Sequence, residues 1–263
     1  MPEEFLRTEN KKGVLTLTLD RPKANAFNDE LIAALQGALK DAARDASVRC
    51  VLLRAEGKLF SAGQDVGALG GEGEEVSFRK HLLKNYNPLI KQIRYLEKPV
   101  LAAINGAAAG AALGIVMACD LRIASEEARF FVGFSGIGLA PDSAVSLMLP
   151  ALIGLGRAAQ AAYFNEAITA EQALAWGLVN AVVPAGELDA AAEQWAAKLA
   201  AGPTGAIGLT KRDFNRAILP NLDEVLDYEA HNQEIAGRGA DHKEGLAAFL
   251  EKRDPDYVKA SKK

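Results

Sequence analysis

The sequence predicts an α/β fold, and two patterns along the chain carry that prediction. Short β-prone runs recur up to about residue 187, and each is followed by a glycine-containing turn and a segment compatible with a helix. Beyond that point the strand signal fades and helical periodicity dominates. Alternation of this kind is typical of a sheet whose strands are joined by right-handed crossover connections.

The first strand is expected at residues 13–20, where apolar and polar residues alternate with the period of two that marks a half-buried strand. Asp20-Arg21-Pro22 ends this strand, because proline cannot continue the hydrogen-bonded ladder. A loop then leads to Asn28, a good helix N-cap that is followed by leucine and isoleucine at helical spacing. The chain is therefore expected to begin with a strand, a loop and a helix.

Four further strands and four C-terminal helices complete the prediction. The strands are expected at residues 50–53, 99–104, 121–124 and 130–132. The helices are expected at residues 188–201, 203–218, 223–236 and 243–252. We therefore predict a core at residues 1–200 and a helical region at 201–263, which would cover an active site or pack against another subunit.

Composition describes an ordinary globular protein and excludes several functions. The chain has 263 residues, 49% of them hydrophobic, and a net charge of −4. Apart from a short basic C-terminus it has no block of like charges, so nucleic acid is not an expected partner. The acidic opening Pro2-Glu3-Glu4 lacks a signal-peptide pattern, which predicts a cytoplasmic protein. The longest apolar stretch, 100–118, is rich in alanine and glycine and contains Asn105, so we expect no membrane span.

The cysteines and histidines favour structural roles. Cys50 and Cys119 stand inside apolar runs, where a buried inert thiol is the expected state. The three histidines, His81, His231 and His242, lack metal-ligand spacing, so we expect surface or capping roles for them and no metal site. Two charged residues that flank a predicted strand, Asp120 and Arg122, are expected to form a structural polar pair.

The segment from Gly138 to Ser143 places one carboxylate, Asp142, directly after Pro141 and at the start of an apolar run. Proline restricts its own φ and the backbone of the preceding residue, so the chain reaches Asp142 in a stiff conformation. A carboxylate held in this way suits a general base. The alternative is that Asp142 is only the N-cap of the following helix.

Two turns rich in glycine and alanine, at residues 60–65 and 105–112, each follow a predicted strand. Small residues let backbone N–H groups approach a ligand, and the first N–H groups of a helix lack intrahelical acceptors. Two converging N–H groups would stabilise an oxyanion formed from a thioester carbonyl. Turns of this composition are also common as purely structural features, and that alternative stays open at this point.

Five blocks of the sequence together resemble the enoyl-CoA hydratase/isomerase (crotonase) superfamily. In chain order they are RPKANAFN, FSAGQD, KPVLAAINGAAAG, CDLRIAS and EGLAAFLEKRDPDY. The resemblance implies a ClpP-like ββα spiral core with a C-terminal helical region, assembled as a homotrimer or a dimer of trimers. It also implies an acyl-CoA thioester substrate and no cofactor, because coenzyme A is part of that substrate.

The same resemblance implies roles for individual residues. The backbone N–H groups of Gln64 and Ala111 would form the oxyanion hole. The residues implied to bind CoA or substrate are Lys23, Ala24 and Ala26 beside the adenine, Ser61 and Ala62 along the pantetheine, Asp65, and Phe249 and Lys252 from an adjacent subunit. Asp65 is expected to brace its loop rather than to transfer protons.

This chain differs from the hydratases that it resembles at two positions. Those enzymes add water with two glutamates, and the corresponding residues here are Gly114 and Phe134. Asp142 remains, and one carboxylate suffices to remove an α-proton and return it at the γ-carbon. Apolar neighbours are expected to raise its pKa, whereas a helix N-terminus would lower it.

Further blocks resemble the phenylacetate-pathway branch of the superfamily, whose members convert the ring epoxide of an aromatic CoA thioester into an oxepin and also move 3-enoyl-CoA double bonds. These blocks are residues 131–142, 86–89 and 236–241. Relatives often have Gly-Gly where this chain has Ala144-Val145, a difference that concerns the shape of the substrate pocket. Two alternatives stay open, namely a hydratase or other crotonase enzyme that uses Asp142 on water, and a CoA-binding protein without catalysis.

Overall fold

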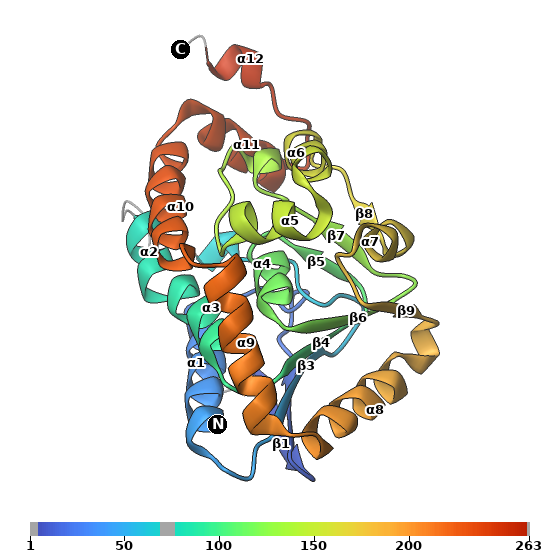
Figure 1. The fold of residues 1–263 in the computed structure, drawn as a ribbon. Coiled ribbons are helices and arrows are strands. Elements are labelled where there is room, and N and C mark those ends of the chain that lie inside the picture. Colours follow the sequence, from blue (N-terminus) through green and yellow to red (C-terminus); the bar gives the residue numbers. More distant parts are fainter. Residues whose placement is uncertain (1–4, 69–76, 262–263) are drawn as a thin grey trace.

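The computed structural model describes residues 5–68 and 77–261, in which two sheets and their covering helices form the α/β architecture drawn in Figure 1. The larger sheet has the strand order β1-β2-β3-β4-β6-β9, and only the β1–β2 pair is antiparallel. Its strands are β1 (Leu6–Lys11), β2 (Val14–Leu19), β3 (Cys50–Ala55), β4 (Val100–Ile104), β6 (Leu121–Ser125) and β9 (Ala181–Val183). The smaller sheet, of order β5-β7-β8, contains β5 (Ala107–Ala109), β7 (Arg129–Phe131) and β8 (Ile168–Thr169).

The chain places successive strands in the two sheets alternately and then adds a helix. β4 lies in the larger sheet, β5 follows in the smaller one, and α4 (Ala111–Ala118) comes next. β6 and β7 repeat this step before α5 (Val145–Ile153). A parallel bridge between Ser61 and Ala108 extends the smaller sheet towards the segment that follows β3. This arrangement brings the turns after β3 and β5 to the same edge, where the candidate site lies.

Helices cover both faces of the larger sheet, since alternate residues of its central strands are buried on opposite sides. Cys50 and Leu52 of β3 pack with α8 (Leu188–Ala201), which crosses the lower right of Figure 1. Val51 and Leu53 belong to the main core on the other face, together with residues of α1 (Asp29–Arg44), α3 (Tyr86–Tyr95) and α4. A strand buried on both faces is typical of a parallel sheet, and its apolar run is what made β3 recognisable in the sequence.

The remaining helices complete the fold. They are α2 (Phe78–Lys84), α6 (Leu155–Phe164), α7 (Ala170–Trp176), α9 (Thr204–Ile218), α10 (Leu222–Gly237), α11 (Ala240–Glu251) and α12 (Tyr257–Ala260). Asn28 caps α1 as predicted, because its side chain accepts a hydrogen bond from the Leu31 N–H. The four predicted C-terminal helices are confirmed as α8 to α11. The division of the chain at residue 200 stays a prediction.

Two sequence expectations about buried polar groups have different outcomes. Both cysteines are buried and free, as expected, and burial raises the pKa of each thiol to about 12. The expected pair of Asp120 with Arg122 is wrong, because the Asp120 carboxylate lies 3.1 Å from Arg94 and 2.7 Å from Lys211. The Arg122 guanidinium instead donates to backbone carbonyls. Within the described ranges, no helix combines the length and the apolar character needed to cross a membrane.

Candidate functional site

The two turns that follow β3 and β5 meet at one edge of the sheets. Gly63, with φ of +87°, approaches the turn before α4 so closely that a Cβ there would lie 2.6 Å from the Ala109 carbonyl oxygen. The same Cβ position is 3.7 Å from the Ala111 nitrogen. Ala111 is the first residue of α4, so its N–H has no acceptor within the helix. The close approach of the two chains therefore depends on glycine at position 63.

Gln64 follows Gly63 in a short parallel bridge with Phe27. The bridge uses the Phe27 N–H, which donates to Gly63, and the Asp65 N–H, which donates to Phe27. The Gln64 side chain is held separately, because its Oε1 accepts hydrogen bonds from the Tyr86 hydroxyl at 2.6 Å and from His81 Nε2 at 3.0 Å. Neither bridge bond uses the Gln64 N–H, and within the described ranges neither this N–H nor that of Ala111 donates to another backbone group.

A cavity of about 460 Å³ opens beside these two N–H groups. Most of its lining is apolar or aromatic, and the large side chains come from three regions of the chain: Phe78 and Leu82, then Phe131, Phe134, Ile137 and Leu139, and finally Phe249. Its polar lining consists of a small number of side chains, which include Gln64, His81, Tyr86, Asp142, Asn165 and Gln233. An apolar hollow with few convergent polar groups is the usual form of a small-molecule site.

The structure brings most of the predicted site residues together. Those that line the cavity are Lys23, Ala26, Ala62, Gln64, Asp65, Ala111, Asp142 and Phe249. Ala24 lies, with Lys23 again, in a neighbouring surface hollow. Ser61 is fully buried behind the lining, where its hydroxyl donates to the Asn25 carbonyl. Lys252 is exposed at the C-terminal end of α11, and its expected role at an adjacent subunit stays a prediction.

Asp65 forms an ion pair with Arg21 at 2.9 Å, and both side chains are mostly buried. The same guanidinium donates to the Ala26 carbonyl. Asp65 thus ties the turn after β3 to the loop of residues 21–27, as expected for a residue that braces its loop.

Asp142 is buried at the base of the cavity, and it does not cap α5. That helix begins at Val145 without a side-chain cap from the preceding residue. Instead, Asp142 Oδ1 accepts a hydrogen bond from the Ser143 hydroxyl at 2.7 Å, and Oδ2 accepts one from Gln233 at 2.9 Å. The N-cap alternative for the Asp142 side chain is therefore wrong, and its carboxylate is free of the helix.

Burial raises the pKa of Asp142 to about 6, while the hydrogen bonds from Ser143 and Gln233 act in the opposite direction. The expected upward direction is confirmed, but the opposing influence is these two side chains rather than a capped helix. A carboxyl group with such a pKa is ionised at neutral pH and basic enough to accept a proton.

His81 was expected at the surface or in a cap, and the structure corrects this because its side chain, 14% exposed, lines the cavity. Burial lowers its pKa, so the imidazole is neutral at pH 7. Asn85 Nδ2 lies 2.9 Å from its Nδ1 and also donates to Asp29. This contact assigns the proton to Nε2, which then donates to Gln64. Sequence reasoning missed the residue because His81 carries no local motif.

The two positions that hold glutamates in hydratases contribute no acid or base. Gly114 lies in the middle of α4, where a Cβ would be 2.5 Å from the Ser143 carbonyl oxygen. Phe134 places an apolar ring in the cavity lining. Among the described lining residues, only Asp65 and Asp142 have carboxyl groups, and Asp65 is paired with Arg21. Within residues 5–68 and 77–261, no group of three or more His, Cys, Asp or Glu side chains could hold a metal ion.

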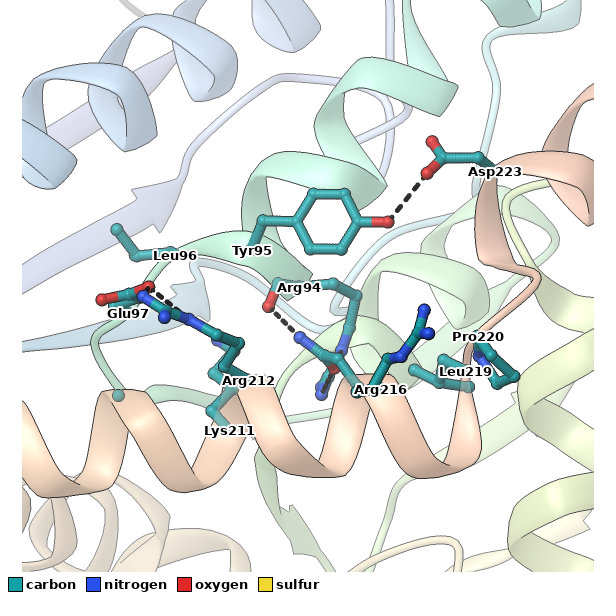
Figure 2. Close-up of a pocket in the computed structure, with 12 residues that line it drawn as sticks. Arg94, Tyr95, Leu96, Glu97, Lys211, Arg212, Arg216, Leu219, Pro220 and Asp223 are labelled. Atoms are coloured by element: carbon teal, nitrogen blue, oxygen red, sulfur yellow. Dashed lines mark hydrogen bonds and ion pairs between the residues drawn. The ribbon is translucent and has the colours of Figure 1, made fainter.

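A second cavity, of about 410 Å³, lies between α3 and α9 and is shown in Figure 2. Its buried cations, Arg94 and Lys211, are both paired with Asp120. At its rim the Tyr95 hydroxyl points to Asp223, to which it donates at 3.0 Å. None of the predicted site residues lies here, and the buried cations already have a partner in Asp120.

Comparison with known proteins agrees with this geometry. Residues 9–260 match the family model described as enoyl-CoA hydratase/isomerase. The chain is 41% identical to the 1,2-epoxyphenylacetyl-CoA isomerase of Escherichia coli K12 over 97% of this chain and 98% of that protein. It is 38% identical to a probable enoyl-CoA hydratase of Rhodobacter capsulatus, over 98% and 99% of the two chains. A solved enoyl-CoA hydratase from Mycobacterium avium subsp. paratuberculosis superposes with a TM-score of 0.88 at 35% identity, covering 97% and 99%.

Proposed function

The chain belongs to the enoyl-CoA hydratase/isomerase family, and within it we propose that the protein is an acyl-CoA isomerase whose base is the Asp142 carboxylate. One observation carries the proposal. Of the described residues that line the cavity, Asp142 is the only one whose carboxyl group has no cationic partner. A lone buried carboxylate beside two available N–H groups supports chemistry in which one group first accepts and then returns a proton.

In the proposed reaction the thioester carbonyl binds between the N–H groups of Gln64 and Ala111. Asp142 removes a proton from the α-carbon, and the electron pair moves into the carbonyl to form an enolate. The two N–H groups stabilise the resulting oxyanion, and donors of this kind contribute about 3 kcal/mol each to lowering the barrier. Asp142 then returns the proton at the γ-carbon, so that a β,γ double bond becomes conjugated and no atom is gained or lost.

We propose that the substrate is the ring epoxide of phenylacetyl-CoA, whose acyl group carries a planar six-membered ring, with 3-enoyl-CoA thioesters as further substrates. The relative at 41% identity is a 1,2-epoxyphenylacetyl-CoA isomerase, which supports this choice. The cavity lining supports it as well, because Phe78, Tyr86 and Phe134 offer ring surfaces to the planar ring of the acyl group. The CoA moiety would then extend past Ala62 towards Lys23 and Ala24, and no cofactor beyond it is proposed.

We also propose that the protein assembles as a homotrimer or a dimer of trimers through its C-terminal part. Large apolar side chains are exposed on α6 and on α9 to α12. They include Tyr163, Phe164, Phe214, Ile218, Tyr228, Leu250 and Val258. Burial of such surface against another copy is the usual explanation for its exposure on a single chain.

Hydration is the other reaction that a family member could perform, and the site disfavours it. Activation of water needs a second well-placed acid or base, which contributes about 10²–10⁴-fold. Gly114 lacks a side chain and Phe134 cannot transfer a proton. We therefore expect slow hydration at most, with Asp142 acting on water.

The test is incubation of wild-type and Asp142→Asn protein with a 3-enoyl-CoA in deuterated water, followed by NMR and mass spectrometry. We expect conjugated product and deuterium incorporation with the wild type, and neither with Asp142→Asn. Asp213→Asn is the matched control, because Asp213 is exposed on α9 and is not part of the cavity lining. A 3-hydroxyacyl product would instead identify a hydratase. A third outcome is that the protein binds CoA but catalyses no deuterium exchange, either with the 3-enoyl-CoA or with the ring epoxide. This outcome would indicate a protein that binds CoA without catalysis.

A further inference from the structure

The turn that carries Asp142 has an unfavourable backbone conformation. Ser143 and Ala144 follow one another with φ of 56° and 62°, in the left-handed region. A Cβ disfavours this region, and glycine is the residue usually found there. Both residues are fully buried, so the turn cannot relax into solvent. Something outside the turn must hold it in place.

Glu229 of α10 supplies part of the support. Its Oε2 accepts a hydrogen bond from the Ala144 N–H at 2.7 Å, and its Oε1 accepts one from the Ser146 N–H at 2.9 Å. The Ser146 hydroxyl also lies 2.5 Å from Oε1. The carboxylate therefore takes the place of the missing side-chain cap of α5 and fixes the left-handed turn at the same time.

Gln233, one helical turn further along α10, supplies the remaining support for the turn and for the Asp142 side chain. Its Nε2 donates to Asp142 Oδ2 at 2.9 Å, and its Oε1 accepts from the Ala140 N–H at 3.1 Å. The side chain is almost completely buried, at 2% exposure. A glutamine suits this place because it has both a donor for the carboxylate and an acceptor for the backbone.

We propose that Glu229 and Gln233 are positioning residues that hold the Asp142 carboxylate in its working orientation, a role that rests on Asp142 being the base proposed above. Glu229 fixes the turn and Gln233 fixes the carboxylate itself. Two other titratable groups, Glu229 and Tyr86, are buried close enough for the Asp142 charge to raise their pKa. Burial raises the pKa of Glu229 to about 7 and raises that of Tyr86 as well, so Tyr86 is a neutral hydroxyl, which donates to Gln64.

The direct test is the titration of the Asp142 carboxyl by NMR of protein labelled at aspartate ¹³Cγ, with the signal assigned by its loss in Asp142→Asn. Gln233→Met keeps the length of the side chain and removes the donor. Because the donated hydrogen bond favours the charged carboxylate, we expect the midpoint to rise by about one pH unit. Gln194→Met, at an exposed position of α8, is the matched control and should leave the midpoint unchanged.

The kinetic test follows turnover of the 3-enoyl-CoA against pH. The acid limb of kcat/KM should shift with the NMR midpoint in Gln233→Met, which a merely structural role would not produce. Glu229→Gln loses one acceptor for the backbone, so kcat should fall at least about tenfold with little change in KM, because only the orientation of the base is affected. Glu224→Gln, the same exchange at an exposed position of α10, should retain the wild-type kcat.

Two results would overturn the proposal: an Asp142 midpoint in Gln233→Met equal to that of the wild type, or a wild-type kcat in Glu229→Gln. If Gln233→Met does not fold, Gln233→Glu takes its place, since it is isosteric and replaces the donor with an acceptor. Its Asp142 midpoint should also rise, and an unchanged midpoint would overturn the proposal equally. Unaltered turnover in Asp142→Asn would refute the proposed function alone, because the NMR titration still reports whether Gln233 holds the carboxylate.

Discussion

Replacement of Asp142 by asparagine should stabilise the fold at neutral pH while it abolishes isomerisation. In the native protein this carboxyl is buried, and burial raises its pKa from the usual 3.8 to about 6. The folded state therefore binds the proton more tightly than the unfolded state does. Stability is lost as the pH rises from about 4 to about 6, where the carboxyl ionises in the unfolded chain first.

The size of the effect follows from that difference in pKa. At 1.36 kcal/mol per pH unit, ionisation of the buried carboxyl costs the folded state about 3 kcal/mol above pH 7. Asparagine has no such cost. Its amide oxygen can accept from Gln233, and its amide nitrogen can donate to Ser143 after the hydroxyl rotates. The free energy of unfolding of Asp142→Asn should exceed that of the wild type by about 3 kcal/mol at pH 7.5 and by roughly half as much at pH 5.

The assay is urea-induced unfolding of both proteins at equal protein concentration, followed by circular dichroism at pH 5 and pH 7.5. Comparison of the two proteins at each pH removes the contribution of every titrating group that does not interact with Asp142; Glu229, whose pKa the Asp142 charge raises, is the group that does not cancel fully. A difference in unfolding free energy that stays constant between the two pH values would refute the reasoning. A variant less stable than the wild type at pH 7.5 would do so as well, since it would mean that the ionised carboxylate stabilises the fold.

Three other outcomes are expected. The kcat/KM of isomerisation should fall as the pH drops below about 6, because Asp142 must be ionised to accept a proton, and a profile without this limb would count against Asp142 as the base. Gly114→Ala should lower the free energy of unfolding by about 2 kcal/mol and lower kcat, because its Cβ would overlap Ser143. Gly37→Ala, at an open helical position, should instead raise the free energy of unfolding by about 1 kcal/mol in the same urea experiment. Asp120→Asn should cost about 3 kcal/mol of unfolding free energy, because two buried cations lose their counter-charge; an effect below about 1 kcal/mol would contradict that account.

Strands and helices were predictable from the sequence where burial follows a regular period. The alternation at residues 13–20 and the apolar run at 50–53 correspond to β2 and β3, and the helical spacing after residue 187 corresponds to α8 to α11. β1 was missed because five of its six residues are exposed and its composition is polar. β5, β8 and β9 were missed because strands of two or three residues carry no period, and β7, which is equally short, was predicted only from the β-prone residues at 130–132.

The residues of the candidate site likewise divide into those that a local sequence pattern predicts and those that it does not. Asp142 and the glycine turn at residue 63 are visible locally, because proline and glycine restrict or free the backbone of their immediate neighbours. Glu229 and Gln233 are not visible locally, since each acts through a partner far along the chain. Gln233, for example, meets Asp142 across 91 positions. His81 is not visible either, because it carries no local motif.

The sequence by itself therefore determined the α/β class, the C-terminal helices and the identity of the candidate base, because backbone preference and hydrophobic periodicity act between neighbouring residues. Only the tertiary structure decided that Asp142 is buried without a cation, that it does not cap α5, and that α10 holds the turn on which it stands. Burial, and with it the pKa of a carboxyl group, depends on which distant segments pack around that group, and no local pattern of residues specifies this.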